Sequence, residues 1–169
     1  RNIHCDVLVV GAGISGILAA KNAAKNNLKT LLVDEKNELG GSTLFQNEEF
    51  NKIENQSSSE WLKNQIKELK DIKNLEVKVR TSVAAYHGYN YLLARENLTD
   101  HLEKKDKQNK VRQRLLKIRA KKVILATGAL ERPLVFNNND RPGIILANSV
   151  NKYLNFYGVT CGENYFLHI

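Results

Sequence analysis

The stretch CDVLVVGAGISGIL, residues 5–18, decides the fold because it joins two different apolar patterns through a glycine-rich turn. The stretch from Asp6 to Val10 predicts a continuous apolar strand, of the kind that is buried on both faces of a parallel sheet. From Ile14 to Asn26 the apolar and small residues take helical spacing. The turn between strand and helix holds Gly11, Gly13 and Gly16.

The residues that follow predict a βαβ unit. The segment NLKTLLVDE, residues 27–35, predicts a second buried strand that ends in two carboxylates. A lone G-x-G-x-x-G pattern is a weak signal, but this one lies between a strand and a helix, with acids at the end of the next strand. We therefore predict a dinucleotide site. The alternative is that Gly11 and Gly16 only permit a tight turn.

The three glycines have separate expected roles. Gly11 lets the chain turn sharply, Gly13 lets the backbone approach a pyrophosphate, and Gly16 lets the helix lie close to the strand. Free N–H groups in the first turn of the helix, together with the helix dipole, would then hold the phosphate oxygens. The candidate residues of this loop are Gly11, Ala12, Gly13, Ile14, Ser15 and Gly16.

An acid at the end of the second strand would accept hydrogen bonds from the ribose hydroxyls of the adenosine half. Asp34 is preferred for this role, and Glu35 is the competitor that would otherwise be solvated; Lys36 is included with them as a candidate. Because a carboxylate repels a 2′-phosphate, NAD or FAD is favoured over NADP.

Two further segments are expected to pass close to the nucleotide. LGGST, residues 39–43, supplies small residues, although a lone Gly-Gly is more often only a turn. ATGA, residues 126–129, follows a predicted buried strand, Val123 to Leu125, at the same sheet edge. The candidate residues from these segments are Gly40, Gly41, Ser42, Ala126, Thr127 and Gly128.

The rest of the chain predicts further elements around this sheet. After a polar interval at 46–60, Ser57 and Glu60 form a possible capping box, and Trp61 to Ile72 carry a helical apolar stripe. NLEVKVR, residues 74–80, predicts a strand with one exposed side. Residues 81–119 predict short strands, broken at HGYN (87–90), in a β-meander that covers one sheet edge. A helix is expected over 146–157, and a strand beginning in NYFLHI, residues 164–169.

The predicted fold class is therefore α/β: a Rossmann-like FAD/NAD(P)-binding domain with a central parallel sheet, flanking helices and a β-meander. Residues 1–158 are expected to form this domain. Residues 159–169 would then be the first strand of a second lobe that is truncated. Because the chain opens at Arg1 and contains no Met, it is expected to be an excised piece without a signal peptide.

Composition limits the classes of function. The chain has no run of eighteen apolar residues, so no membrane span is expected, and its two cysteines, Cys5 and Cys161, fit a cytoplasmic thiol protein. The net charge of +8 is concentrated in residues 103–122, which hold ten Lys or Arg against two acids. Without an aromatic ladder, a nucleic-acid partner is not expected. This segment is a solvated face or a docking surface.

The sequence shows no catalytic constellation. The four histidines have no ligand spacing, so no metal site is expected, and no Ser-His-Asp or Cys-His order suggests a nucleophile.

Four segments carry a resemblance to a known family. They are CDVLVVGAGISGILAA, LLVDEKNELGGS, RQRLLKIRAKKVILATGALERPLVFNNNDRPGI and LANSVNKYLNFYGV. Together they resemble the α subunits of heterotetrameric sarcosine oxidases, within the flavoprotein-like superfamily that has two dinucleotide-binding domains. Ile14 and Ser15 stand where this family usually has Pro-Ala, a change that leaves the glycine turn intact.

The resemblance implies a holding role for the domain. In this family the domain holds NAD without turning it over, while FAD lies in the β subunit and FMN at the interface of α and β. The whole complex, with β, γ and δ subunits, oxidises sarcosine with oxygen and tetrahydrofolate. Two hypotheses follow: an NAD-holding fragment of an oxidoreductase subunit, inactive by itself, or the FAD-binding part of a related amine or opine oxidase or reductase whose flavin is redox active.

Overall fold

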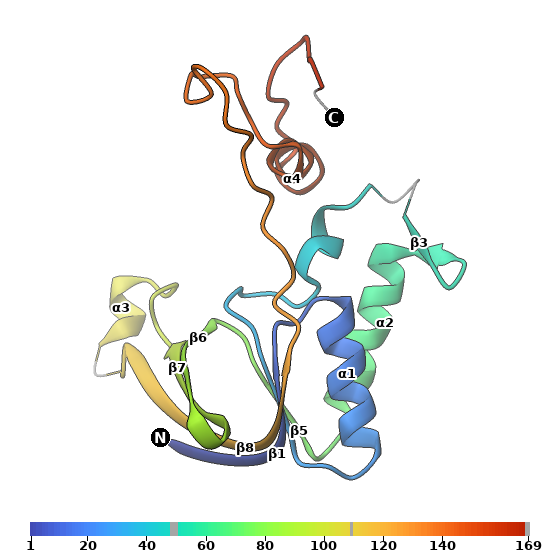
Figure 1. Ribbon diagram of the computed structural model, residues 1–169. Helices are drawn as coiled ribbons and strands as arrows, with labels where there is room; N and C mark the ends of the chain where they lie inside the picture. Colours follow the sequence, from blue (N-terminus) through green and yellow to red (C-terminus); the bar gives the residue numbers. More distant parts are fainter. Residues whose placement is uncertain (48–50, 109, 168–169) are drawn as a thin grey trace. The chain divides into compact units, whose positions relative to one another are not determined.

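A twisted sheet of six strands carries the fold, in a computed structural model that describes residues 1–47, 51–108 and 110–167 (Figure 1). The strands lie in the order β5-β2-β1-β8-β7-β6. The parallel strands are β5 (Leu75–Lys78), β2 (Thr30–Val33), β1 (Asn2–Val10) and β8 (Gln113–Leu125). The antiparallel strands are β7 (Tyr91–Asn97) and β6 (Thr81–His87). The predicted α/β fold class is confirmed, and the sheet is mixed because the meander is hydrogen-bonded directly to the parallel part.

The chain separates into two compact units. The first comprises residues 1–41 and 62–128, and it contains the whole sheet; the second comprises 42–61 and 129–169. The second holds most of η1 (Gly41–Phe45), a small hairpin of β3 (Lys52–Ile53) and β4 (Gln56–Ser57), and α4 (Ala147–Tyr157). The helix α2 (Ser58–Lys70) runs through the division at residues 61 and 62. A boundary after residue 158 stays a prediction.

The helix α1 (Ile14–Lys25) covers one face of the sheet. It packs on β1 and β2 through small and branched residues, among which Ile17 and Ala20 are fully buried. The strands beneath it are buried on both faces, since each residue of β2 is buried and so are the last four of β1. The apolar run that was expected to begin at Asp6 is therefore a central strand, and it begins four residues earlier, at Asn2.

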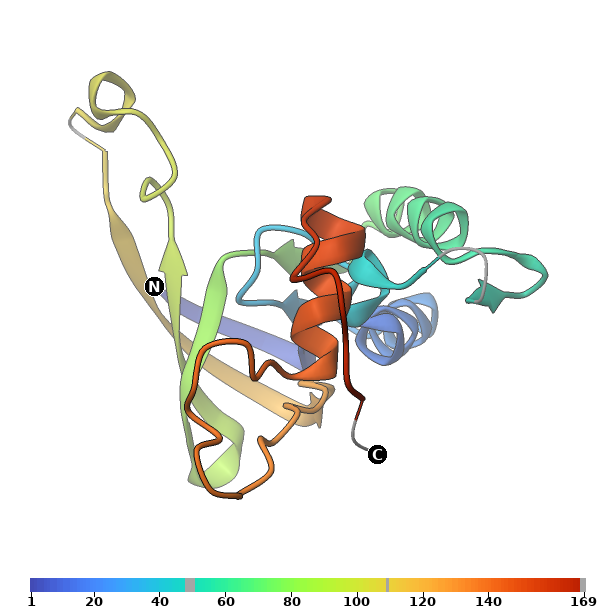
Figure 2. The same cartoon turned by 90° about the horizontal axis from the view of Figure 1, so that it is seen from above.

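The other face of the sheet encloses a hydrophobic core beneath the meander. Figures 1 and 2 both show β6 and β7 curling back beside β1 and β8. Because side chains alternate along a strand, every second residue of β8 and β7 points into this core. Its members are Ile3, Cys5, Leu8, Val10, Leu31, Val33, Leu92, Ala94, Leu116, Ile118 and Ala120.

One long strand joins the meander to the parallel sheet. β8 pairs antiparallel with β7 over Gln113–Arg119 and parallel with β1 over Lys117–Leu125. The predicted strand over Val123–Leu125 is confirmed, but the prediction that it is buried holds only for Val123, which packs against the core. These residues are the end of β8, and Ile124 and Leu125 are 38% and 61% exposed. The end is exposed because α1 packs mainly on β1 and β2.

The capped helix predicted after the polar interval is confirmed as α2. The Glu60 N–H donates to Ser57 Oγ at 3.2 Å, which is half of a capping box. Trp61 and Leu69 are buried, as the apolar stripe predicted. The Lys21 ammonium of α1 bonds to Gln65 Oε1 and Glu68 Oε2 of α2, at 2.6 and 2.7 Å, and ties the two helices together.

The remaining predictions concern segments of which the structure describes all or only some of the residues. The break at HGYN is the turn η2 (Gly88–Asn90), and the basic hairpin between β7 and β8 has the short helix α3 (Lys104–Lys107) near its tip. The expected helix at 146–157 is confirmed as α4. Residues 159–167 contain no strand, and 168–169 and part of the polar interval (48–50) lie outside the described residues, so the strand in NYFLHI stays a prediction. No described helix has the length and apolarity to cross a membrane.

The two cysteines should differ in reactivity towards Ellman's reagent at about pH 8. Burial raises the pKa of the Cys5 thiol to about 11, whereas Cys161 is half-buried. Because the thiolate is the nucleophile, the shift from 9.0 lowers the reactive fraction of Cys5 about 100-fold. One thiol should therefore react quickly in the native chain and a second only after unfolding. Equal rates in the native chain would contradict the burial of Cys5.

Candidate nucleotide-binding site

Gly11 begins the loop, and its backbone lies in close contact with the end of β2 and with Ala126, which follows β8. Its N–H donates to Val33 O at 2.8 Å, and it has a φ of 98°, in the region that favours glycine. A Cβ at this position would lie 2.3 Å from Ala126 O. The end of β1 can therefore turn only if residue 11 has no side chain, as the sequence predicted.

Gly16 sets how close the start of α1 lies to the loop. A Cβ on Gly16 would be 1.8 Å from the carbonyl oxygen of Gly11 and 3.4 Å from the Cβ of Ala126. Because no side chain fits there, the helix starts directly against the loop and the end of β8. This geometry agrees with the predicted role of the third glycine.

Gly13 is different, since it faces open space. Its φ of −72° and ψ of −176° are extended backbone, and a Cβ there would meet no heavy atom within 4 Å. Nothing in the protein's own packing therefore requires glycine at this position. The open side of Gly13 is consistent with the close approach of a ligand.

The first turn of α1 offers unsatisfied amide donors beside Gly13. The first intrahelical bond runs from the Ile17 N–H to Gly13 O at 2.9 Å, which leaves the N–H groups of Ile14, Ser15 and Gly16 ahead of it. No described side chain caps this end, and no acid lies in the first turn. Together with the positive end of the helix dipole, these donors suit a diphosphate.

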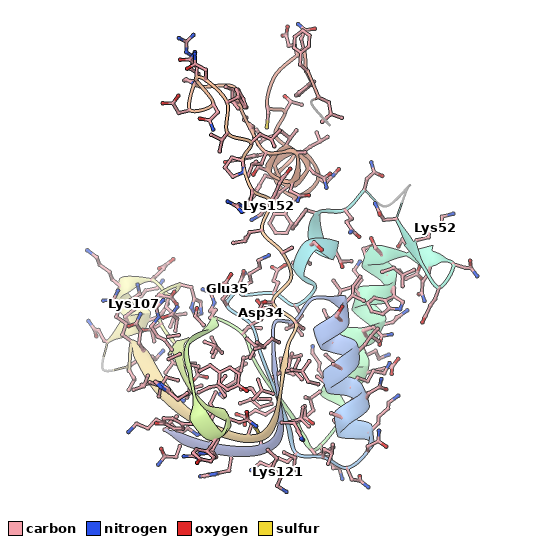
Figure 3. The ribbon with its side chains drawn as sticks, viewed as in Figure 1. Asp34, Glu35, Lys52, Lys107, Lys121 and Lys152 are labelled. Carbon is pink, nitrogen blue, oxygen red and sulfur yellow. The ribbon has the colours of Figure 1, made fainter. Side chains whose placement is uncertain are left out.

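Asp34 follows β2 directly and holds the glycine loop. Its Oδ2 accepts the Ala12 N–H at 2.6 Å, and its Oδ1 accepts the Lys36 N–H at 2.8 Å. No hydrogen bond or ion pair joins the exposed Glu35 side chain to another described residue. Figure 3 labels both residues at the carboxyl end of β2. Of the two acids, only Asp34 has its carboxylate against the loop.

The two small-residue segments differ in where they lie. Gly40 donates its N–H to Ala12 O at 2.8 Å, and a Cβ on Gly41 would lie 2.9 Å from Gly13 Cα, so this turn packs on the glycine loop. Ala126 lies opposite Gly11 and donates its N–H to Val10 O at 2.7 Å; the exposed Thr127 and Gly128 follow it. Ser42 is exposed and belongs to the second unit.

A segment that the sequence reading did not assign to the site also lies at this edge. The Asp34 N–H donates to Lys78 O, the Thr81 N–H donates to Asp34 O, and the Arg80 N–H donates to Lys36 O. The bonds are 2.9, 2.7 and 2.7 Å long, respectively. The signal was present in the predicted strand at 74–80, because the carboxyl ends of neighbouring parallel strands meet at one edge. Residues 78–81 thus lie beside Asp34 and Lys36 at this edge of the sheet, and we call this segment the 78–81 wall.

Ion pairs centred on the buried Glu96 connect the 78–81 wall to the meander. Lys78 Nζ lies 2.7 Å from Glu96 Oε1, with both side chains 10% exposed, and Arg114 Nη1 lies 3.2 Å from Glu96 Oε2. These contacts join β5, β7 and β8 around the core. Among the described residues, no group of three His, Cys, Asp or Glu side chains could hold a metal ion.

The family follows from the comparison of the whole chain. A family model described as pyridine nucleotide-disulphide oxidoreductase matches residues 5–159, from the first strand past the last helix. The chain belongs to this family. Membership indicates a flavin or nicotinamide dinucleotide as the cofactor, and the glycine loop, the uncapped helix start and Asp34 fit such a ligand.

Relatives within the family support the resemblance in the sequence. The chain is 42% identical over 162 residues to the sarcosine oxidase subunit alpha of Corynebacterium sp. (strain P-1), covering 96% of this chain and 16% of that protein. It is 39% identical over 160 residues to the subunit of the same name from Rhizobium meliloti (strain 1021), covering 95% and 16%. The chain thus spans about one sixth of these relatives.

Solved oxidoreductases share the fold. L-proline dehydrogenase from P.horikoshii is 26% identical with a TM-score of 0.74, over 96% of this chain and 30% of that one. Thioredoxin reductase from Streptococcus pyogenes MGAS5005 is also 26% identical, with a TM-score of 0.53 over 79% and 38%. The sequence relatives and the solved structures given above are all named as oxidoreductases or as subunits of oxidoreductases.

Alanine at Gly16 and alanine at Gly13 should have opposite outcomes. Gly16→Ala places a Cβ 1.8 Å from the Gly11 oxygen, so we expect a loss of at least about 2 kcal/mol in the free energy of unfolding. Gly13→Ala meets nothing within 4 Å and should change stability by less than about 0.5 kcal/mol. Urea denaturation of both variants checks this. Equal losses would mean that the loop is packed differently.

Proposed function

We propose that the first unit binds NAD and holds it without turnover, as part of an α-type subunit of a sarcosine oxidase complex. The observation that carries the proposal is the placement of Asp34, whose carboxylate braces the glycine loop beside an uncapped helix start. The proposed cofactor-binding residues of this unit are those predicted from the sequence, with Glu35 kept only as the alternative to Asp34: Gly11, Ala12, Gly13, Ile14, Ser15, Gly16, Asp34, Glu35, Lys36, Gly40, Gly41, Ala126, Thr127 and Gly128. Ser42, which belongs to the second unit, stays a prediction.

Each part of the site has a definite task in this proposal. The N–H groups at the start of α1 bind the diphosphate, and the bare backbone of Gly13 lets it come close. Each Asp34 oxygen accepts one backbone N–H and keeps a lone pair for a ribose hydroxyl. The same charge repels a 2′-phosphate, which favours NAD over NADP.

A holding role is supported by what surrounds the loop. The sequence has no nucleophile constellation, and the residues that line the loop are backbone groups, glycines and one braced acid. The protein's contribution is therefore to bind and orient. When bound, the nicotinamide would supply a hydride acceptor.

The activity of the whole complex is proposed from the relatives named as sarcosine oxidase subunits. It would be the oxidative demethylation of sarcosine with oxygen and tetrahydrofolate. The β, γ and δ subunits would be the partners, with FAD and FMN held elsewhere and the chain working in the cytoplasm. Since this chain spans 16% of those relatives, we expect it to be inactive in isolation.

The alternative is that the domain holds FAD, as part of a related flavin-dependent amine or opine oxidase or reductase. Family membership supports either dinucleotide. The test is to denature the purified subunit, measure the visible absorbance of the released ligand and determine its mass. We expect a colourless ligand with the mass of NAD. A yellow ligand with the mass of FAD would overturn the proposal in favour of the alternative.

Asp34 and Glu35 provide a matched pair for testing the ribose contact. Asp34→Ala removes a charged acceptor and should weaken NAD binding by about 1–3 kcal/mol in calorimetry. Glu35→Ala removes the same charge from an exposed position that makes no contact with the loop, and it should leave affinity unchanged. The reverse result would move the ribose contact to Glu35.

A further inference from the structure

Part of the sheet face that carries α1 is left uncovered. α1 packs on β1 and β2, over the carboxyl-terminal half of β1. β1 begins at Asn2 and β8 at Gln113, so both strands extend well beyond the helix towards the meander. On the first part of β1 and β8, the residues that alternate with the core members are exposed. No described helix packs on this part of the face.

The strand register places specific side chains next to one another on this uncovered area. Arg119 of β8 pairs with His4 of β1 and with Tyr91 of β7, and Tyr91 pairs with His87 of β6. In the next rows Lys117 pairs with Leu93, and Leu115 with Arg95. We name this area the basic sheet face; its members are His4, His87, Tyr91, Leu93, Arg95, Leu115, Lys117 and Arg119.

The cations of the basic sheet face have no acidic partner. No ion pair joins Arg95, Lys117 or Arg119 to another residue in the described part of the chain, and all three are exposed. The acids on these strands are already paired: Asp6 of β1 with Lys121 at 2.8 Å, and Glu96 of β7 with Lys78 and Arg114. Figure 3 labels Lys121, which belongs to the same alternate set of β8 residues. The basic sheet face therefore carries three positive charges, on Arg95, Lys117 and Arg119, that no described acidic side chain neutralises.

The geometry makes these cations one compact patch with apolar residues between them. Neighbouring strands are about 4.8 Å apart and alternate residues about 6.8 Å apart, so the backbone of Lys117 lies roughly 7 Å from that of Arg119 and roughly 8 Å from that of Arg95. Arg95 and Arg119, at the two ends of the patch, are roughly 14 Å apart. Leu115 is 52% exposed and lies among them. An area with apolar residues among arginines has the composition that protein interfaces favour.

We propose that the basic sheet face docks an acidic surface of a partner protein. A second copy of this chain is disfavoured as the occupant, because each copy has a net charge of +8 and opposing faces would repel. Nucleic acid is disfavoured because the Arg119 guanidinium lies 5.2 Å from the centroid of the Tyr91 ring, which occupies a face that a base would need. The proposal concerns a different surface from the nucleotide site and does not depend on which dinucleotide is bound.

The first test measures binding of a labelled 20-residue polyglutamate peptide to the full chain by fluorescence anisotropy. The variant carries Arg95→Ala, Lys117→Ala and Arg119→Ala, and its control carries Lys104→Ala, Lys105→Ala and Lys107→Ala on the exposed helix α3. Both variants lose three charges, so they differ only in where the charge is removed. We expect at least a tenfold loss of affinity in the variant and less than a twofold loss in the control.

Several outcomes would overturn the proposal. Equal losses in the two variants would show that only net charge matters. No loss of affinity in either variant would show that the basic sheet face does not bind the peptide. Tighter binding of a single-stranded 20-nucleotide DNA, lost in the same variant, would assign the face to nucleic acid. Both variants are expected to unfold at the wild-type temperature, because five of the six changed side chains are exposed and the half-buried Lys107 contributes a single hydrogen bond to Asp100 O.

A second measurement uses the assembled complex of the subunit, and it rests on the proposed function for the existence of partners. Acetylation of Lys117 is followed by mass spectrometry and compared with that of Lys104, in the complex and in the separated subunit. We expect Lys117 to be labelled at least fivefold more slowly in the complex, with Lys104 unchanged. Equal labelling of Lys117 in both states would overturn the docking surface, whatever ligand mass the nucleotide test returns.

Discussion

The structure depends on the close approach of three backbone segments at the end of β1. Gly11 presses against the Ala126 carbonyl, and Gly16 presses against the Gly11 carbonyl, at distances that no Cβ permits. This contact lets α1 start at the sheet edge, and it exposes the amide groups ahead of Ile17 beside the open Gly13. Packing therefore accounts for two of the glycines, whereas Gly13 faces open space among the described residues, as the proposed approach of a diphosphate requires.

Asp34 links this contact to the rest of the edge. Its side chain accepts the Ala12 N–H of the loop, while its own backbone bonds to Lys78 and Thr81. One residue thus joins the glycine loop to the wall at 78–81, and the Lys78–Glu96 pair ties that wall to the meander. A change at Asp34 would act on loop position as well as on ribose contact, which is why the exposed Glu35 is a useful comparison.

The length of β8 explains how one sheet has two kinds of surface. Its last residues run beside β1 to the nucleotide loop, and its first residues extend into the meander, beyond the reach of α1. The core side of the strand is buried under the meander, whereas its outer side carries unpaired cations. The proposed nucleotide site and the proposed docking surface therefore lie at opposite ends of the same strand.

The βαβ unit, the glycine loop and the helices α1, α2 and α4 could be predicted from local spacing alone. The signals were an apolar run, glycines at 11, 13 and 16, and helical apolar stripes. The sequence favoured Asp34 over Glu35 without showing which carboxylate contacts the loop, and it predicted a buried strand over Val123–Leu125, because a run of apolar residues does not tell which faces of a strand are covered. The contact of the Asp34 carboxylate with the loop, the position of residues 78–81 beside it and the exposure of part of β8 became evident only in three dimensions. These features depend on which distant strands become neighbours, and that is set by packing of the whole sheet around its core.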